Sequence, residues 1–361
     1  LNYLIIMRYT GLIEKYRDTL PVSNDTRIIS LGEGNTPLIK LENILCEMGT
    51  QVELYIKYEG LNPTGSFKDR GMTMAVTKAV ESGSKAIICA STGNTSAAAA
   101  AYAARAGIKA FVVIPEGKIA LGKLAQAMIH GSTIIQIKGN FDDGMQLVKE
   151  VAEFAPVSIV NSINPFRLQG QKTAAFEIIE ELGHAPDFHC LPVGNAGNIT
   201  AHWMGYTEYF EAGKASSTPT MLGYQAEGAA PFIKGSRVEK PETIATAIRI
   251  GNPQSWDQAL KLSKDSNGWF DSFSDNEILA TQKLLTEKEG IFCEPASAIS
   301  VAGALRDIQS GKIPDHSSVV CTLTGHGLKD PDTAISQCDT GAMININPTL
   351  DEVKKAILDN M

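Results

Sequence analysis

The sequence predicts an α/β fold built on open, twisted, mostly parallel sheets covered by helices on both faces. From Val52 onward, short strand-like runs alternate with longer runs of helical period, which is the pattern of βαβ units. The chain has 361 residues, enough for two domains or one large domain. It is 43% hydrophobic and 20% charged, so it can bury a substantial core.

The predicted elements follow one another in a regular order. Residues 1–30 form a lead-in with one short helical pattern near 12–18, and the turn at 32–38 enters a short strand. Further strands are predicted at 52–59, 85–90, 110–114, 133–137, 158–160, 188–193, 222–225 and 317–323. Helices are predicted at 67–82, 95–106, 121–130, 141–153, 166–182, 199–212, 255–263, 275–290, 296–310 and 350–359. Because ligands in such folds bind at the carboxyl ends of strands, the loops there are candidate functional sites.

Composition narrows the class of protein. The formal net charge is −8 and no long basic run is present, which argues against nucleic acid or an anionic membrane as the main partner. The 6 cysteines form no C-x-x-C pair and are predicted to be free thiols in a reducing compartment. The 6 histidines show no H-E-x-x-H spacing, so no metal site is predicted. No window reaches the length of a membrane span, and a soluble cytoplasmic protein is expected.

The stretch N-P-T-G-S-F-K-D-R at 62–70 lies between a predicted strand and a predicted helix. Ser66 is expected to cap the helix, with Asp69 completing a capping box, which places Lys68 in the first turn. The positive end of the helix dipole lowers the pKa of an amine there, and a neutral amine is what imine chemistry requires. Taken alone, however, a lysine at a helix start is more often a solvated loop residue.

Four further loops follow predicted strand ends. S-T-G-N-T-S at 91–96 is either a capped, tightly packed helix start or a ring of polar donors facing a ligand. G-N-A-G-N at 194–198 joins a strand to a helix start, which suits a single phosphate. In T-G-H-G at 324–327, Thr324 is the better candidate, because a histidine in such a loop is more often a turn residue. N-S-I-N-P-F-R at 161–167 ends in an arginine suited to a phosphate or carboxylate, although a surface role is the simpler interpretation of that arginine alone.

Taken together, these motifs resemble those of the fold-type II pyridoxal-phosphate enzymes, and among them the threonine synthases. The resemblance rests on the lysine motif at 62–70, S-T-G-N-T-S-A at 91–97, G-N-A-G-N at 194–198, L-T-G-H-G-L-K-D-P at 323–331, E-G-N-T-P-L at 33–38 and E-P-A-S-A at 294–298. It spans residues 30–335 of the chain. Related dehydratases and cysteine synthases share the lysine and asparagine motifs, but usually have a serine- and glycine-rich phosphate loop and a different final motif.

The resemblance implies two open, twisted, mostly parallel sheet domains with a cofactor in the cleft between them. Residues 62–160 would form a small α/β domain, and residues 1–61 plus 161–361 a large α/β domain with a C-terminal tail. A cytoplasmic homodimer is expected, with a small-molecule substrate as its partner. The sequence as given carries no long regulatory extension like that of the plant enzymes, so activation by S-adenosylmethionine is not expected.

The implied reaction converts O-phospho-L-homoserine and water to L-threonine and phosphate, the last step of threonine biosynthesis. Lys68 would hold pyridoxal 5'-phosphate as a Schiff base and then shuttle protons. The other cofactor contacts would be Asn94 at the ring oxygen, Thr324 at the ring nitrogen, and Gly194, Asn195, Ala196, Gly197 and Asn198 at the phosphate. The substrate phosphate would be held by Ser91, Thr95, Asn161, Ser162, Arg167 and Asn195, with Lys118 or Lys123 nearby. Two alternatives stay open: a threonine or serine dehydratase of the same fold, and a non-catalytic sensor of a phosphorylated ligand.

Overall fold

Two sheets organise the structure, a computed structural model that describes residues 8–117, 121–139, 141–338 and 343–360. The larger sheet has six strands in the order β1-β2-β10-β7-β8-β9, and the smaller has four in the order β5-β4-β3-β6. Strand β1 runs antiparallel to β2, and the other neighbouring pairs are parallel. The predicted α/β class with mostly parallel sheets is confirmed.

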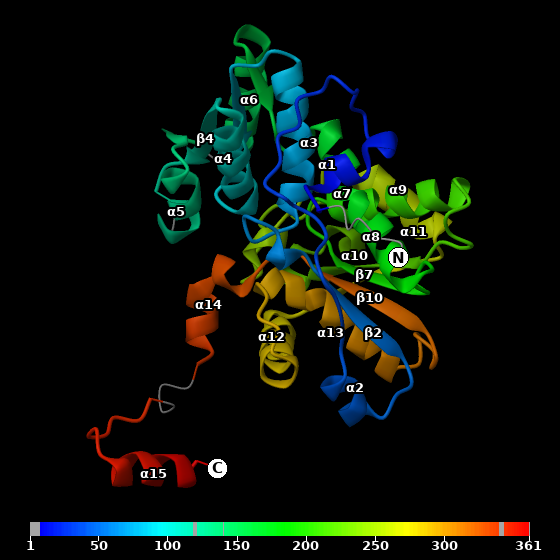
Figure 1. The fold of residues 1–361 in the computed structure, drawn as a ribbon, viewed down its shortest axis with the longest axis vertical. Helices are drawn as coiled ribbons and strands as arrows, with labels where there is room; N and C mark the ends of the chain where they lie inside the picture. The colour runs from blue at the N-terminus through cyan, green and yellow to red at the C-terminus, as the bar shows by residue number, and fades with distance from the viewer. Residues whose placement is uncertain (1–7, 118–120, 140, 339–342, 361) are drawn as a thin grey trace, which may run out of the picture.

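Strands and helices alternate along most of the chain (Figure 1). The strands are β1 Leu38–Lys40, β2 Glu53–Tyr58, β3 Ala86–Ala90, β4 Lys109–Pro115, β5 Thr133–Ile137, β6 Val157–Ile159, β7 Phe188–Pro192, β8 Thr220–Ala226, β9 Trp269–Phe273 and β10 Ser318–Leu323. The α-helices are α1 Leu12–Lys15, α2 Asn43–Met48, α3 Lys68–Glu81, α4 Asn94–Ala106, α5 Leu121–Ile129, α6 Phe141–Phe154, α7 Pro165–Gln171, α8 Thr173–Leu182, α9 Gly197–Glu211, α10 Pro231–Lys234, α11 Trp256–Asp265, α12 Asp275–Glu289, α13 Pro295–Gln309, α14 Pro331–Ser336 and α15 Leu350–Leu358. Short 3-10 helices include η2 Glu59–Leu61 and η5 Gly327–Lys329.

Helices cover both faces of the four-stranded sheet. Ile87 and Cys89 of β3 pack in one core with side chains from α3, α4 and α5. Ile88 and Ala90 point to the opposite face and pack against Val148 of α6. Because successive residues of a strand alternate between faces, a continuously apolar strand such as β3 requires a cover on each side.

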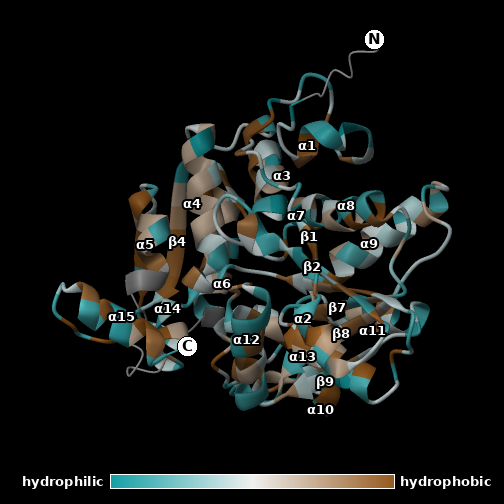
Figure 2. Ribbon diagram, turned by 60° about the horizontal axis from the view of Figure 1, so that its bottom comes forward, coloured by the Kyte–Doolittle hydropathy of each residue, from teal (hydrophilic) through white to brown (hydrophobic). Residues whose placement is uncertain are grey.

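The six-stranded sheet is also a middle layer. One face packs against α2, α12 and α13, through residues that include Leu54, Leu222 and Val319. The other face packs against α1, α8, α9 and α11, with Leu191 and Met221 in the contact. Figure 2 shows hydrophobic residues on the strands and polar residues on the outer turns of the helices. This burial accounts for the apolar strand runs in the sequence.

The carboxyl ends of the central strands meet at one edge of the six-stranded sheet. The register pairs Leu323 at the end of β10 with Tyr58 at the end of β2. Strand β7 runs parallel to β10 on its other side. The loop before Lys68, the loop at 194–198 and Thr324 therefore leave the sheet at the same edge, which fixes the place of the candidate site.

Helix α3 packs closely against α7. A Cβ atom at Gly170 would collide with the carbonyl oxygen of Arg70, and one at Gly71 would lie 2.7 Å from the Gln171 amide nitrogen and 3.1 Å from the Cβ of Arg167. Glycine at these two positions lets the helix backbones approach each other. As a result, Arg167 lies beside the first turns of the helix that begins at Lys68.

A buried ionic network joins α3 to the six-stranded sheet. The Arg70 guanidinium donates to Glu59 at 2.6 and 2.7 Å and to Glu177 at 2.6 and 2.8 Å, and the Lys57 amine lies 2.9 Å from Glu177. All four side chains are buried. Burial by itself raises the pKa of the Glu177 carboxyl. Arg70 and Lys57 lower it by more than burial raises it, so the pKa lies below its ordinary value. Two cations thus compensate two anions inside the core.

The Arg70→Ala variant is expected to lose roughly 3–5 kcal/mol of unfolding free energy, because it leaves buried carboxylates without their cation. Urea unfolding of the full-length protein measures the loss. Arg237→Ala is the matched control, because Arg237 pairs with Glu239 at the surface, where the two side chains are 66% and 69% exposed. An exposed pair contributes at most about 1 kcal/mol. Equal losses in the two variants would contradict a stabilising role for the buried network.

Some predicted elements differ from the observed ones. The helix predicted at 166–182 is two helices, α7 and α8, which meet at Lys172 where the Thr173 hydroxyl donates to the Gly170 carbonyl. Strand β9 was not predicted, because it lies at the sheet edge, is largely half-buried and lacks a continuous apolar run. Helices α2, α10 and α14 were also missed, and each has only four to six residues.

The strands of the two sheets come from different ranges of the sequence. The strands of the four-stranded sheet fall within residues 62–160, and those of the six-stranded sheet fall outside that range. The exact domain division stays a prediction. Among the helices of the described ranges, none is both long and apolar enough to cross a membrane.

Candidate active site

Lys68 is held beside Thr324 by pairing between two loops. Ser66 and Gly325 form an antiparallel bridge, and the Phe67 N–H donates to the Thr324 carbonyl at 2.9 Å. The His326 N–H donates to the Gly65 carbonyl, also at 2.9 Å. These backbone bonds fix the start of α3 against the end of β10.

The Lys68 amine is suited to act as a neutral nucleophile. It lies over the Phe67 ring, 4.0 Å from the ring centroid, and has no hydrogen bond or ion pair to the described residues. Burial lowers the pKa of Lys68 to about 7; the Arg167 guanidinium acts in the same direction and Glu294 opposes it. A substantial fraction of the amine is therefore neutral near pH 7.

The predicted capping box at the start of α3 is wrong. The N-cap residue is Phe67, with no side-chain cap, and the Ser66 hydroxyl accepts only a long bond from the Lys68 N–H at 3.4 Å. Asp69 turns back instead and accepts from the Thr64 N–H at 2.6 Å and from its hydroxyl at 2.5 Å. Asp69 therefore stabilises the turn before the lysine, because the nearby Thr64 offers two donors at once.

Asn94 and Thr324 meet at one carboxyl group, that of Glu294. The Asn94 amide donates to the two Glu294 oxygens at 3.3 and 3.1 Å, and the Thr324 hydroxyl donates to one of them at 3.3 Å. Asn94 begins α4 on the four-stranded sheet, whereas Thr324 follows β10 of the six-stranded sheet. The structure therefore brings these two predicted cofactor contacts together across the two sheets.

A second contact between the sheets involves the loop that precedes Lys68. The Thr64 carbonyl accepts from the Gln126 amide of α5 at 3.2 Å and from the Lys329 amine of η5 at 3.0 Å. Lys329 also donates to the side-chain oxygen of Gln126 at 2.7 Å. The loop before Lys68 is thus hydrogen-bonded both to α5 and to η5.

Arg167 is a buried cation whose positive charge disfavours the charged form of the Lys68 amine. It is 3% exposed, and among the described residues its Nε has no hydrogen-bond partner and its Nη1 makes only a 3.4 Å bond to the Val160 carbonyl. Burial lowers the pKa of Arg167 to about 10. No carboxylate of the described residues pairs with it. A buried guanidinium without an anion is unfavourable by itself and suits an anionic ligand.

The loop at 194–198 presents unpaired donors in front of α9. Ala196 has a φ of 61°, and both polar atoms of the buried Asn198 side chain lack a partner. Within the described residues, the backbone N–H groups of 194–198 have no acceptor. The Asn195 side chain accepts a 3.4 Å bond from the Gln254 N–H. Unpaired N–H groups at a helix start form an arrangement that binds a phosphate.

The remaining predicted phosphate contacts vary in how free their side chains are. Ser91 and Ser162 are half-buried in loops that follow β3 and β6, and Thr95 is half-buried in the first turn of α4. Asn161 is buried, and its amide already donates to and accepts from the backbone of Ala90 at 2.9 and 3.0 Å. Because an amide NH2 group has two N–H donors, one of them is left, and the role of Asn161 at the substrate phosphate stays a prediction. Lys118 lies outside the described residues, and Lys123 belongs to α5.

The residues present fit pyridoxal phosphate. The site offers an amine with a lowered pKa, unpaired donors at 194–198 for a phosphate, and polar side chains at Asn94 and Thr324 for the ring. It also keeps a separate buried cation, Arg167, for a second anion. In the described part of the chain, no cluster of three or more histidine, cysteine, aspartate or glutamate residues could hold a metal ion.

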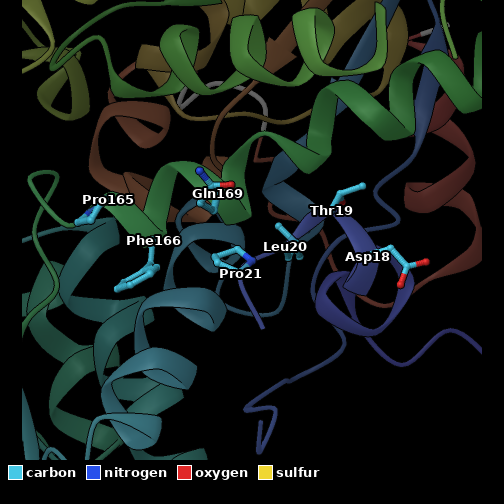
Figure 3. A pocket seen from close by; sticks show the side chains of 7 residues that line it. All are labelled: Asp18, Thr19, Leu20, Pro21, Pro165, Phe166 and Gln169. Atoms are coloured by element: carbon cyan, nitrogen blue, oxygen red, sulfur yellow. The ribbon is translucent and has the colours of Figure 1, made fainter. Parts of the chain in front are cut away.

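Two surface hollows lie apart from these residues. Figure 3 shows one of about 440 Å³ on the outer side of α7, lined by Asp18, Thr19, Leu20, Pro21, Pro165, Phe166 and Gln169. The other, of about 680 Å³, is lined by Ala125, Gln126, Met128 and Ile129 of α5. Neither is lined by Lys68 or another predicted site residue, so neither marks the reaction centre.

Sequence reasoning missed the place of Glu294 and Ser297. Both belong to the E-P-A-S-A motif at 294–298, which gave a resemblance but no role. Ser297 contacts the Thr324 hydroxyl at 2.9 Å and accepts from the Gly325 N–H at 2.9 Å. In sequence terms, Glu-Pro before an apolar helical run indicates only a helix start, because proline is favoured at the first helical position, so the place of Glu294 in the site could be seen only in the structure.

Comparisons with known proteins agree with this geometry. A family profile described as "Pyridoxal-phosphate dependent enzyme" matches residues 29–325. The chain is 57% identical to the threonine synthase of Synechocystis sp. over 350 residues, which cover 97% of this chain and 91% of the relative. It is 56% identical to the threonine synthase of Halalkalibacterium halodurans over 355 residues, 98% of each chain. Among solved structures, maize serine racemase matches with a TM-score of 0.72 at 21% identity and covers 98% of this chain and 99% of that one.

Proposed function

The chain belongs to the family of pyridoxal-phosphate dependent enzymes, and from this premise we propose that it is a threonine synthase that converts O-phospho-L-homoserine and water to L-threonine and phosphate. One observation carries the choice of substrate. The site has two separate places for an anion, the loop at 194–198 and the buried Arg167. A cofactor phosphate needs one of them, and a phosphorylated substrate needs the other.

Each group of residues has a defined task in this proposal. The loop at 194–198 would hold the cofactor phosphate, while Asn94 and Thr324 would orient its ring. Pyridoxal phosphate, when bound, supplies an electron sink that stabilises negative charge on the substrate carbon atoms. Lys68 would hold the cofactor and move protons, for which a pKa of about 7 suits an amine at neutral pH.

Arg167 would bind the substrate phosphate and stabilise its charge as it leaves. Its planar fork can make two charge-assisted hydrogen bonds to one phosphate. Ser91, Thr95, Ser162 and Asn195 are the proposed neutral donors around that phosphate, and Asn161 the proposed support of their loop. The phosphate leaves from Cγ, which gains a proton and becomes the methyl group, while the hydroxyl group of water is added at Cβ in place of a hydrogen, which gives threonine.

Product analysis tests the proposed function. The purified protein is loaded with pyridoxal phosphate and given O-phospho-L-homoserine, and threonine and phosphate are expected in equal amounts. L-threonine and L-serine are offered in parallel. Formation of 2-oxobutanoate from threonine as the main activity would identify a dehydratase, and a change in the visible spectrum without turnover would identify a sensor of the phosphorylated ligand.

We also infer a cytoplasmic homodimer. The cysteines found in the structure, Cys46, Cys89, Cys190, Cys293, Cys321 and Cys338, are free, as expected in a reducing compartment. The homodimer rests on the family resemblance alone. Light scattering of the loaded protein during gel filtration measures its mass directly.

Removing the Thr324 hydroxyl is expected to weaken catalysis. Thr324→Val keeps the side-chain shape but leaves the buried partners Ser297 and Glu294 without that hydroxyl. A lost buried hydrogen bond costs about 1–3 kcal/mol, so kcat/KM should fall roughly five- to 150-fold. Thr324→Ser should restore most of the activity. Wild-type kinetics and an unchanged visible spectrum in Thr324→Val would show that Thr324 is not part of the site.

A further inference from the structure

Glu294 joins the two halves of the site through direct contacts. It is 5% exposed and lies immediately before α13. Its oxygens accept from Asn94 at 3.1 and 3.3 Å and from Thr324 at 3.3 Å. Gly325 makes room for it, because a Cβ atom there would lie 2.5 Å from the Glu294 carboxyl carbon. The carboxyl group is therefore enclosed by the two side chains that it holds.

The hydrogen bonds around Glu294 can be followed in one direction. The Gly325 N–H donates to the Ser297 hydroxyl at 2.9 Å. That hydroxyl lies 2.9 Å from the Thr324 hydroxyl, which donates to Glu294 at 3.3 Å. With the Asn94 amide also donating, Glu294 receives donors only. An ionised carboxylate can accept all of these hydrogen bonds at once.

Charged groups from several elements face this carboxylate. Burial raises the pKa of Glu294 above its ordinary value, and the hydrogen bonds from Asn94 and Thr324 and the charges of Lys329 of η5 and Lys68 of α3 offset only part of that rise. Lys68 in turn faces Arg167 of α7, which lowers its pKa, and Glu294, which raises it. Lys329 also faces Asp69 of α3, and the Cys293 thiol faces Glu294 itself. When it is ionised, Glu294 is thus the carboxylate that favours the charged form of the Lys68 amine.

We propose that Glu294 is a positioning residue, which fixes Asn94 and Thr324 across the two sheets and presents a negative charge to Lys68. The inference rests on the proposed function for the meaning of Asn94 and Thr324 as ring contacts. Glu294 acts through these neighbours and does not itself react with the substrate. Its hydrogen bonds and its charge are two separable contributions.

Two substitutions separate the contributions. Glu294→Gln keeps the length and a carbonyl acceptor but removes the charge, whereas Glu294→Ala removes both. Glu287→Gln is the matched control, because Glu287 makes only a surface pair with Lys283 and its side chain is 61% exposed. Each full-length variant is examined for its cofactor dissociation constant, by dialysis and absorbance, and for its thermal unfolding.

A second readout follows Lys68 without turnover. The full-length protein, before cofactor is added, is pulsed with acetic anhydride between pH 5.5 and 9, and labelling of Lys68 is measured by peptide mass spectrometry. Only the neutral amine reacts. Loss of the facing anion disfavours the charged amine, so the midpoint of labelling should move to lower pH in Glu294→Gln and Glu294→Ala. A shift of half to one pH unit makes labelling at pH 6 about three- to fivefold faster.

The expected pattern is specific. Glu294→Ala should weaken cofactor binding by about tenfold or more, and Glu294→Gln by less than about threefold, because the amide keeps the acceptor. Unchanged cofactor affinity in Glu294→Ala, or an unmoved labelling midpoint in Glu294→Gln, would overturn the proposal. If Glu294→Ala fails to fold, the midpoint in Glu294→Gln decides alone. A wild-type protein that binds cofactor but forms no threonine refutes the proposed function and leaves these measurements intact.

Discussion

Lys68→Ala is expected to abolish threonine formation, with a loss of at least about a thousandfold in kcat. The variant removes the amine that we propose holds the cofactor and moves protons, and alanine can perform neither task. Threonine release is measured under saturating O-phospho-L-homoserine, and the visible spectrum of the same sample shows whether cofactor is held in the wild-type manner. Near wild-type turnover would exclude Lys68 as the catalytic lysine.

The control for this variant lies on the same helix. Lys78 pairs with Glu81 at the last turn of α3, so Lys78→Ala should leave kcat unchanged. Folding of Lys68→Ala should also be intact. Because the folded-state pKa of Lys68, about 7, lies below the ordinary value of 10.5, the cofactor-free wild type binds fewer protons when folded than when unfolded. This lysine therefore destabilises the fold most below pH 7, and the penalty shrinks as the pH rises toward 10.5.

Arg167→Ala is expected to lower kcat/KM for O-phospho-L-homoserine by about ten- to a thousandfold. A hydrogen bond to a charged group contributes roughly 1.5–3 kcal/mol, and the guanidinium can make more than one to a phosphate. Its Nε has no partner in the structure, so that donor is available. Cofactor binding should survive, because the cofactor phosphate is assigned to the loop at 194–198. Kinetics and cofactor absorbance are measured on the same sample.

Two comparisons sharpen the Arg167 test. Arg167→Lys keeps the charge but loses the planar fork, so it should recover only part of the activity. Arg105, at the end of α4, donates to the Ser30 carbonyl in an exposed bond, and Arg105→Ala should be kinetically silent. Loss of the cofactor in Arg167→Ala would move Arg167 to the cofactor phosphate, and an absent kinetic effect would exclude it from the site.

Much of the fold could be predicted from the sequence because its strands are buried on both faces. The run at 85–90 is apolar throughout, and the structure has β3 at Ala86–Ala90 between two helical layers. Strand β9 lacks this signal, since an edge strand with half-buried residues need not be apolar. Local pattern also could not decide the break at Lys172, because that residue keeps helical dihedral angles.

The candidate site also contains residues that the sequence could predict and residues that only the folded structure places. Lys68, Asn94 and Thr324 could be proposed from motifs at strand ends, and the structure brings them into one neighbourhood. Asp69 could not be placed from spacing alone, because Thr64 offers it a pair of donors that only the folded turn creates. Glu294 could not be placed either, since its contacts to Asn94 and Thr324 span 200 and 30 residues of sequence.

The Arg70 network has a mechanical consequence for the reaction. Helix α3 shares a core with the four-stranded sheet, yet Arg70 ties the same helix to Glu59 and Glu177 beside the six-stranded sheet. If one sheet rotates against the other without breaking these ion pairs, the axis of the rotation lies along α3. Lys68 then keeps its place relative to Thr324, and only the side that carries Asn94 swings. Such a rotation would leave the Lys68 amine stationary relative to Thr324 and change only its distance from Asn94.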